Sequence, residues 1–190
     1  VSGVPNYFGL QRFGRRAHNL ALASAVFEGK RMKRNLRSIA ISAARSFIFN
    51  EVLSARVAGG SWGRLVPGEP ANLDGSASIF VPSCEDDTLF ARLQALDIHP
   101  TGPLWGAGKM LVSGEIANLE RTLADKHRML ASGLEELAAR PGRRALRLSI
   151  HDVDWSIADD RLEIWFHLGK GSFATTVLRE LITIIDDKHS

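Results

Sequence analysis

The amino-acid sequence predicts an α+β fold, because helical periodicity and strand-like alternation occupy separate parts of the chain. Residues 32–58 carry an apolar stripe at helical spacing, and residues 114–137 are mostly helical in pattern. Residues 146–155 and 162–168 alternate well enough for two strands joined at an Asp-Asp turn, as in a β-hairpin. The 190 residues suffice for one large domain or two small ones with hydrophobic cores.

The first half of the chain divides at glycines and prolines. A helix is predicted over 11–29, with small and apolar side chains near helical spacing and Gly29 as its stop. The second helix, over 32–58, ends at a Gly-Gly pair. Residues 61–78 are expected to form a loop with short strands around 62–66. A short strand over 78–81 then stops at a proline.

The second half is punctuated in the same way. A helix is predicted over 86–95 and a structured loop over 97–108, where glycine and proline are frequent. Pro141-Gly142 breaks the helical segment that begins at Gly114. After the hairpin, residues 169–172 form a tight connection into a final helix over 173–185.

Composition narrows the class of protein. A pI of about 9.4 and a formal charge of +3 are compatible with an RNA partner without requiring one. The single cysteine, Cys84, excludes an internal disulfide and fits a reducing, cytoplasmic location. The sequence has no apolar run long enough to span a bilayer and no visible signal peptide. Because Val1 leads straight into a functional-looking motif, we expect this chain to be the C-terminal part of a longer protein.

That motif occupies residues 4–14 and concentrates the groups that a nucleotide pocket needs. Phe8 offers a flat ring, and Asn6 and Gln11 can each donate and accept hydrogen bonds. Arg12 suits a phosphate, and glycines at 9 and 14 let the backbone turn or approach a ligand closely. A flat face, an amide and a phosphate contact together are what a pocket for one unstacked nucleotide requires.

The segment Asn6-Tyr7-Phe8-Gly9-Leu10-Gln11-Arg12-Phe13-Gly14 resembles the signature of the TruD family of tRNA pseudouridine synthases. Further family landmarks follow in order at 42–50, 99–106, 143–146 and 171–181, so the resemblance covers nearly the whole chain. It implies part of a pseudouridine-synthase-type core, with a mixed or antiparallel sheet, interrupted by an inserted α/β domain. The core segments are then expected at 1–31 and 148–190, and the insert at 32–147.

The resemblance also implies an activity and a set of site residues. The family isomerises uridine to pseudouridine in tRNA, at position 13 of the D-arm, with one nucleophilic aspartate and no metal or organic cofactor. That aspartate belongs to a Gly-Leu-Lys-Asp type motif upstream of residue 6, and the sequence contains no such motif. We therefore expect no catalytic residue in this chain and no activity from it alone. Asn6, Phe8 and Phe173 match pocket residues of the family, with Gln11, Arg12 and Asn19 as a second tier.

Phe8 or Phe173 is expected to stack on the target base, and Asn6 to anchor it through hydrogen bonds. From the residues alone, ordinary core packing would be the simpler explanation of both rings. An alternative function is a non-catalytic RNA-binding module that keeps the pocket and lacks the nucleophile. The sequence does not determine the oligomeric state. A monomer is expected for the full-length protein, whereas unpaired strand edges in a partial core could drive dimerisation.

Basic residues form two clusters that could contact tRNA phosphates. The main cluster comprises Arg15, Arg16, Lys30, Arg31, Lys33, Arg34 and Arg37. The second comprises Arg140, Arg143, Arg144 and Arg147. For any single member, a solvated surface role is the simpler explanation.

Other candidate sites are weak. Gly169-Lys170-Gly171-Ser172 lacks the complete phosphate-loop spacing and is better explained as a turn. The histidines have no metal-ligand spacing, and no serine hydrolase elbow is present.

Overall fold

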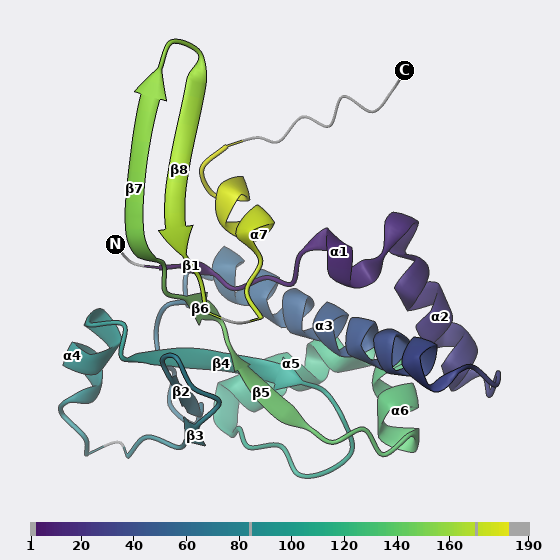
Figure 1. Ribbon diagram of the computed structural model, residues 1–190. Helices are drawn as coiled ribbons and strands as arrows, with labels where there is room; N and C mark the ends of the chain where they lie inside the picture. The colour runs from purple at the N-terminus through teal and green to yellow at the C-terminus, as the bar shows by residue number, and fades with distance from the viewer. Residues whose placement is uncertain (1–2, 84, 170, 183–190) are drawn as a thin grey trace.

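The computed structural model describes residues 3–83, 85–169 and 171–182, and confirms the predicted α+β class with antiparallel sheets (Figure 1). The helices are α1 Leu10–Phe13, α2 His18–Phe27, α3 Arg34–Ala58, α4 Leu89–Gln94, α5 Gly114–Lys126, α6 Arg128–Glu136 and α7 Ala174–Arg179. The strands are β1 Val4–Pro5, β2 Ala71–Leu73, β3 Ile79–Phe80, β4 Ile98–Leu104, β5 Gly142–Ala145, β6 Arg147–Leu148, β7 His151–Ala158 and β8 Arg161–His167. Cys84, Lys170 and residues 183–190, with the predicted end of the final helix, lie outside the described residues.

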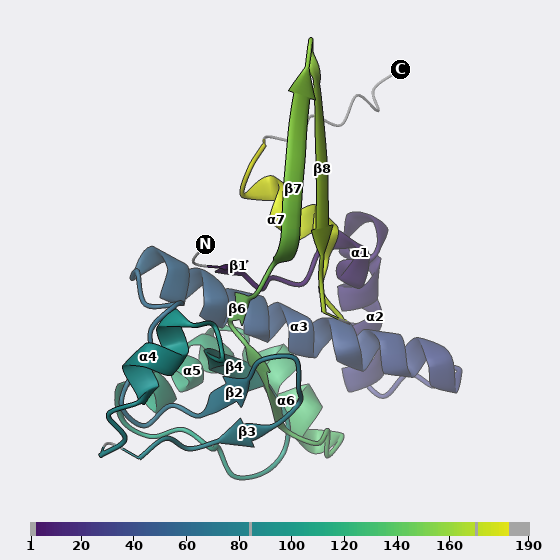
Figure 2. The ribbon, with the colours of Figure 1, turned by 60° about the vertical axis from the view of Figure 1, so that its left-hand side comes forward.

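The longest element, α3, confirms the helix predicted over 32–58. Ala40, Ala44 and Ile48 are fully buried along one stripe and pack against α2 and α6. Small side chains at two of these three positions allow the helices to approach closely. Figures 1 and 2 both show α2 alongside the N-terminal half of α3. This packing fixes the start of the chain, including the 4–14 motif, on one side of α3.

The helix predicted over 11–29 is interrupted, because the backbone changes hand after α1. Gly14 has a φ of +74°, and Arg16 and Ala17 have φ values of 52° and 58°. Such left-handed residues cannot continue a right-handed helix and cost roughly 1–2 kcal/mol each when they are not glycine. The helical pattern therefore restarts as α2, and Asn19 joins the two pieces by donating from Nδ2 to the Arg12 carbonyl oxygen over 3.0 Å.

The loop predicted over 97–108 is wrong for residues 98–104, which form β4, an inner strand of a four-stranded sheet ordered β3-β2-β4-β5. Two prolines and a glycine in this segment had indicated a loop. β2 pairs only with residues 98–100 and β5 only with residues 101–104, so each half of β4 has a paired strand on one side only, with a further hydrogen bond from the Leu146 nitrogen to the Pro100 carbonyl oxygen. The missing donor of each proline can then face an unpaired side, the situation in which strands tolerate proline.

The prediction of short strands around 62–66 is also wrong. That segment is turn and irregular backbone, and the strand lies instead at 71–73. The reason is the buried ion pair between Arg56 and Glu69, whose nearest oxygen and nitrogen lie 2.9 Å apart. Arg56 also donates to the carbonyl oxygens of Ser61 and Arg64, and therefore holds the intervening backbone in a turn.

The predicted hairpin is confirmed as β7 and β8, but its first strand begins at His151 and not at residue 146, because residues 147–148 pair with β1 instead. The hairpin projects from the remainder of the described chain as a two-stranded ribbon (Figures 1 and 2). Trp155 and Ile157 are 63% and 66% exposed. They alternate along β7 and pair with Ile164 and Leu162, so these side chains share one face of the ribbon. Isolated two-stranded hairpins are marginally stable in water, and this ribbon has an uncovered apolar face within the described part of the chain.

The beginning and the end of the described chain meet at a short antiparallel pair. Val4 lies opposite Leu148 in β1 and β6, and α7 packs nearby. The final helix ends at Arg179, earlier than predicted. A buried cluster of Phe8, Phe49, Leu53 and Leu146, with Phe173 packed against it, fills the space beside this pair.

Candidate functional site

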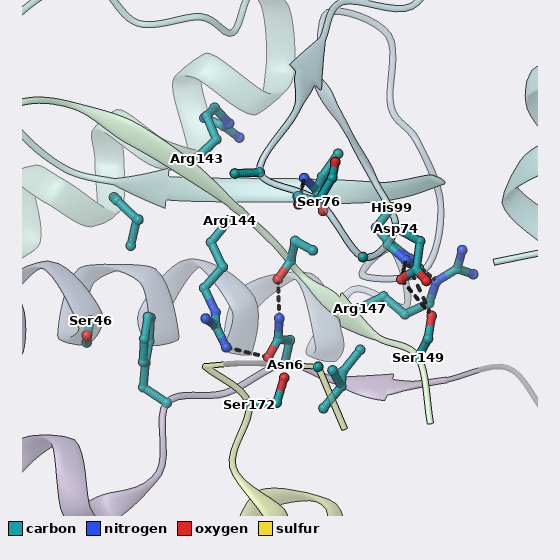
Figure 3. Close-up of a pocket in the computed structure, with 18 of the residues that line it drawn as sticks. Asn6, Ser46, Asp74, Ser76, His99, Arg143, Arg144, Arg147, Ser149 and Ser172 are labelled. Atoms are coloured by element: carbon teal, nitrogen blue, oxygen red, sulfur yellow. Dashed lines mark hydrogen bonds and ion pairs between the residues drawn. The ribbon is translucent and has the colours of Figure 1, made fainter. Parts of the chain in front are cut away.

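A pocket of about 730 Å³ opens where α3, the β5–β6 segment, the turn after β2 and residues 169 and 172 meet (Figure 3). This volume lies within the roughly 300–1,000 Å³ typical of ligand sites. The charges in its lining are mainly positive: Arg45, Arg143, Arg144 and Arg147, with Asp74 as the one carboxylate among the described lining residues. Such a balance of charge favours an anionic ligand.

Asn6 lies at the pocket wall and is 6% exposed. Its backbone nitrogen donates to the Leu146 carbonyl oxygen over 2.8 Å, which extends the β1–β6 pairing. Its side-chain Nδ2 donates to the Ala145 carbonyl oxygen over 2.9 Å, and its Oδ1 accepts from an Arg144 nitrogen over 2.6 Å. Both ends of the amide are therefore engaged within the protein, so Asn6 orients Arg144 directly.

Phe8 and Phe173 lie together although they are far apart in the sequence. Their ring centroids are 6.0 Å apart at an interplanar angle of 67°, an edge-to-face contact. Phe8 is 7% exposed and also meets Phe49 edge-to-face at 5.3 Å, whereas Phe173 is only half-buried. Of the two predicted stacking rings, Phe173 keeps more exposed surface, whereas Phe8 is the one that lines the pocket.

Asn50 on α3 determines where Phe8 sits. Its Oδ1 accepts from the Phe8 backbone nitrogen over 2.9 Å, and its Nδ2 donates to the Phe8 carbonyl oxygen over 3.0 Å. Gly9 follows, and a Cβ at that position would lie 3.2 Å from Phe173 Cδ1. The glycine thus permits the close approach of the second ring. Site prediction from the sequence missed Asn50, although it falls within the family landmark at 42–50.

Arg144 crosses the face of Phe8, with its guanidinium carbon 4.3 Å from the ring centroid. Arg12 is 5.2 Å from the same centroid and donates to Ser42 Oγ over 2.9 Å. Burial, and after it the charge of Arg12, lower the pKa of Arg144 to about 10. The site therefore brings two cations together beside an aromatic ring.

The other two arginines of the β5–β6 segment have structural partners. Arg143 forms a buried ion pair with Glu120 over 2.7 Å and also donates to Thr101. Arg147 donates to His99 Nδ1 over 3.1 Å and to two backbone carbonyl oxygens. Figure 3 shows Arg143 directed away from the Asn6–Arg144 pair.

Asp74, His99 and Ser149 form a polar cluster at another part of the lining, and it is not a hydrolase triad. Because His99 Nδ1 accepts from Arg147, the ring donates from Nε2 to Asp74 Oδ1 over 2.6 Å. Ser149 also donates to Asp74, over 3.0 Å, so its hydroxyl faces an acceptor that already receives a hydrogen bond. Burial is the main cause that lowers the pKa of His99, against the opposing effect of Asp74. The neutral ring has no free nitrogen to act as a base for Ser149.

The second-tier residues brace the turn around Phe8. Gln11 donates to Thr175 Oγ1 over a long 3.5 Å, and Asn19 donates to the Arg12 carbonyl oxygen. Arg12 is the member of this tier that lies against both aromatic rings, since it is also 5.8 Å from the Phe173 centroid.

The main basic cluster divides into two groups. All seven side chains are exposed, and none makes an ion pair within the described residues. The groups flank the ten-residue helix α2, which is about 15 Å long at 1.5 Å per residue. The first group is Arg15 and Arg16, and the second is Lys30, Arg31, Lys33, Arg34 and Arg37.

Within the described ranges, no group of three or more histidine, cysteine or acidic side chains is placed to hold a metal ion. No described helix is both long enough and apolar enough to cross a membrane.

Together, the mixed fold and the cationic pocket, with Phe8 in its lining, define an α+β protein with a site for an anionic ligand. The sequence model of the family described as tRNA pseudouridine synthase D (TruD) matches residues 29–181. The chain is 43% identical over 186 residues to tRNA pseudouridine synthase D of Nitrosococcus oceani, which covers 96% of this chain and 52% of that relative. It is 44% identical over 185 residues to the protein of the same name from Methylococcus capsulatus, with the same shares covered. The chain therefore belongs to the TruD family.

A solved structure agrees in fold. The crystal structure described as tRNA pseudouridine synthase D from Methanosarcina mazei superposes with a TM-score of 0.76 at 20% identity, covering 94% of this chain and 61% of that one. At this identity the similarity concerns the fold alone. The chain spans about half the length of the curated relatives that it matches.

Proposed function

We propose that this chain supplies one wall of the uridine pocket of a tRNA pseudouridine synthase. The observation that carries the proposal is the convergence of Asn6, Phe8 and Phe173, from opposite ends of the chain, beside one cationic pocket. These are the positions that match pocket residues of the family. The target position, uridine 13 of the D-arm, rests on the family resemblance.

The reaction is an isomerisation and consumes no second substrate, so the main requirement is a pocket that holds and orients the uridine. The N1–C1′ bond of uridine breaks, a C5–C1′ bond forms, and the proton at C5 is replaced by one at N1. Removing the base from its stack costs a few kcal/mol. Stacking on Phe173, at about 1–3 kcal/mol per base, offsets much of this cost. Phe8 packs edge-to-face against Phe173 and lines the pocket, and Asn6 holds Arg144 over the Phe8 ring.

The nucleophilic aspartate is expected in another part of the protein, and Asp74 is a poor substitute for it. Its Oδ1 accepts from both His99 and Ser149, and Oδ2 lies 3.9 Å from His151 Nε2. Figure 3 shows this cluster apart from the Asn6–Arg144 pair. We therefore assign Asp74 a structural role and propose that the 190 residues alone are inactive.

We further propose the division into core segments at 1–31 and 148–190 and an insert at 32–147. The pairing of β1 with β6 supports it where Val4 of the first segment lies opposite Leu148 at the start of the last, while Pro5 lies opposite Arg147 at the end of the insert. The four-stranded sheet β3-β2-β4-β5 lies wholly between those segments in the sequence. The reducing compartment indicated by a single cysteine suits an enzyme of tRNA in the cytoplasm.

The proposal is tested by pseudouridine formation on unmodified tRNA, measured by mass spectrometry of the nucleosides. The 190-residue chain is expected to form none, and the protein from the complete reading frame is expected to form one per tRNA. Pseudouridine from the 190 residues alone would refute the missing-nucleophile argument, and Asp74→Asn would then identify the replacement. A complete reading frame without a Gly-Leu-Lys-Asp type motif, and without activity, would favour the RNA-binding module.

The exposed basic groups are tested separately through the salt dependence of tRNA binding. Replacing Arg15, Arg31 and Arg34 with alanine in the complete protein should flatten the log–log slope by about 2, since each phosphate contact contributes roughly 0.7–0.9. An unchanged slope would show that these side chains remain solvated in the complex. Arg161→Ala, near the tip of the hairpin and paired with Glu163, provides a control for the loss of a surface arginine outside the basic cluster.

A further inference from the structure

The four arginines of the pocket lining differ in how fully their hydrogen-bond donors are used. Three of them satisfy several donors within the protein. Arg45 donates to the carbonyl oxygens of Leu104, Trp105 and Arg140, Arg143 to Glu120 and Thr101, and Arg147 to His99, Leu93 and Ile98. Arg144 is the exception, because its hydrogen bonds to described residues both come from one terminal nitrogen.

The unused donors of Arg144 mark the part of the pocket lining that can bind a ligand. One terminal nitrogen donates to Asn6 Oδ1 over 2.6 Å and to the Gly171 carbonyl oxygen over 3.2 Å. The Nε is buried and has no hydrogen-bond partner among the described residues, and the same is true of Arg12 Nε. A guanidinium carries five N–H donors, so Arg144 has donors left to offer.

The charge of Arg144 is also uncompensated within the described residues. No carboxylate forms an ion pair with it, and the nearest charge that affects it is the cation of Arg12. Burying a cation without a counter-ion is unfavourable, and it is most readily relieved by an anion that binds there. The low pKa of Arg144 reflects the same imbalance.

The surroundings of Arg144 favour an acceptor that can take two parallel hydrogen bonds from one guanidinium. Its guanidinium carbon lies 4.3 Å from the Phe8 ring centroid, and the hydrogen bond to Asn6 fixes one terminal nitrogen. Arg144 lines the pocket together with Ser172. Arginine in a fixed orientation matches the geometry of phosphate oxygens, which accept two parallel hydrogen bonds.

We infer that Arg144 forms a phosphate subsite, which binds a phosphate of the nucleotide that enters the pocket. Arg12, whose guanidinium carbon lies 5.2 Å from the same Phe8 centroid, reinforces the positive potential. This inference rests on the proposed function for the identity of the nucleotide, and on the geometry of Arg144 for the phosphate.

The test uses NMR of arginine Nε–H resonances in the 190-residue chain. Inorganic phosphate should shift the Arg144 resonance in a saturable manner, and chloride at equal ionic strength should not. Uridine monophosphate should bind roughly tenfold or more tightly than uridine, as expected for charge-assisted hydrogen bonds. The Arg144→Met variant should lose this preference and the Arg144→Lys variant most of it. The control Arg140→Met removes an exposed arginine outside the lining and should keep the preference.

The outcomes separate this inference from the proposed function. Phosphate binding at Arg144 supports the subsite, and a complete protein that binds phosphate there but does not bind uridine contradicts the uridine pocket. Equal affinities for uridine and its monophosphate, or no response of Arg144 to phosphate, overturn the subsite and leave the pocket standing if uridine binds. A response in the 190-residue chain that is absent from the complete protein means that a protein carboxylate occupies the position, which also overturns it.

Discussion

Replacing Arg144 with methionine should separate a ligand-binding cation from a structural one, and its neighbour Arg143 is the matched control. Successive residues of a strand face opposite sides, so the two arginines of β5 enter different surroundings. Arg143 meets Glu120, and these side chains are 4% and 1% exposed. Arg144 meets Phe8 and the pocket.

The free energies can be estimated from these contacts. A fall of the Arg144 pKa from its ordinary value near 12.5 to about 10 corresponds to roughly 3 kcal/mol against the charged form. Against this stand a cation–π contact with Phe8, about 1–2 kcal/mol, and two hydrogen bonds of about 1 kcal/mol each. The two sides nearly cancel, so Arg144→Met should change the free energy of unfolding by about 1 kcal/mol or less. Arg143→Met leaves Glu120 buried without its partner and should cost about 3–5 kcal/mol.

Urea denaturation of the 190-residue chain, followed by circular dichroism, measures both changes. The Arg143→Met variant carries a second signature in its pH dependence. Burial raises the pKa of Glu120, and Arg143 opposes that rise. Without Arg143 the folded chain keeps a proton that the unfolded chain releases, so the loss of stability should grow as the pH rises above about 4.5. A loss for Arg144→Met as large as that for Arg143→Met would refute the view that Arg144 lacks a structural partner.

Three further predictions concern other parts of the molecule. Replacing Trp155 and Ile157 with lysine should reduce self-association in sedimentation velocity and leave the urea midpoint nearly unchanged, because both side chains are more than 60% exposed; a monomer before and after substitution would exclude the ribbon as an association surface. Burial is the main cause that lowers the pKa of His99, so below a pH of about 6.5 the unfolded chain binds a proton that the folded chain does not, and the free energy of unfolding falls. The His99→Gln variant should show a smaller fall in the free energy of unfolding between pH 8 and pH 5. An equally steep fall in the variant would contradict this role of His99. In the complete enzyme, Phe173→Ala should lower the efficiency of isomerisation by roughly 5- to 150-fold and Phe173→Tyr by much less; an alanine variant as active as the wild type would rule out stacking there.

Local patterns predicted the elements whose residues interact mainly with near neighbours in the chain. The apolar stripe along α3 repeats every three to four residues, and apolar and polar side chains alternate in the two strands that flank the single turn of the β7–β8 hairpin. Both elements were therefore predictable. β4 was not, because its tolerance of Pro100 and Pro103 depends on which strand pairs with each half. The break at Gly14–Ala17 was missed because side-chain periodicity carries no information on the sign of φ.

For the site, too, the sequence predicted some features and the fold was needed for others. The residue types of the 4–14 motif and the family resemblance selected Asn6, Phe8 and Phe173, and the structure places the two rings 6.0 Å apart. In the sequence, Arg143, Arg144 and Arg147 are equivalent members of one basic cluster. The fold distinguishes them, since Glu120 on α5 approaches Arg143 and no described carboxylate approaches Arg144.

The sequence by itself determined the α+β class, the long helix, the hairpin and the chemical types available for a nucleotide pocket, because these follow from short-range patterning and composition. Only the tertiary structure decided which strand edges pair, which aromatic ring remains accessible and which arginine keeps unused donors. Those properties depend on which charges and rings from distant segments come within a few ångströms of each other, and contact of that kind is a property of the packed chain.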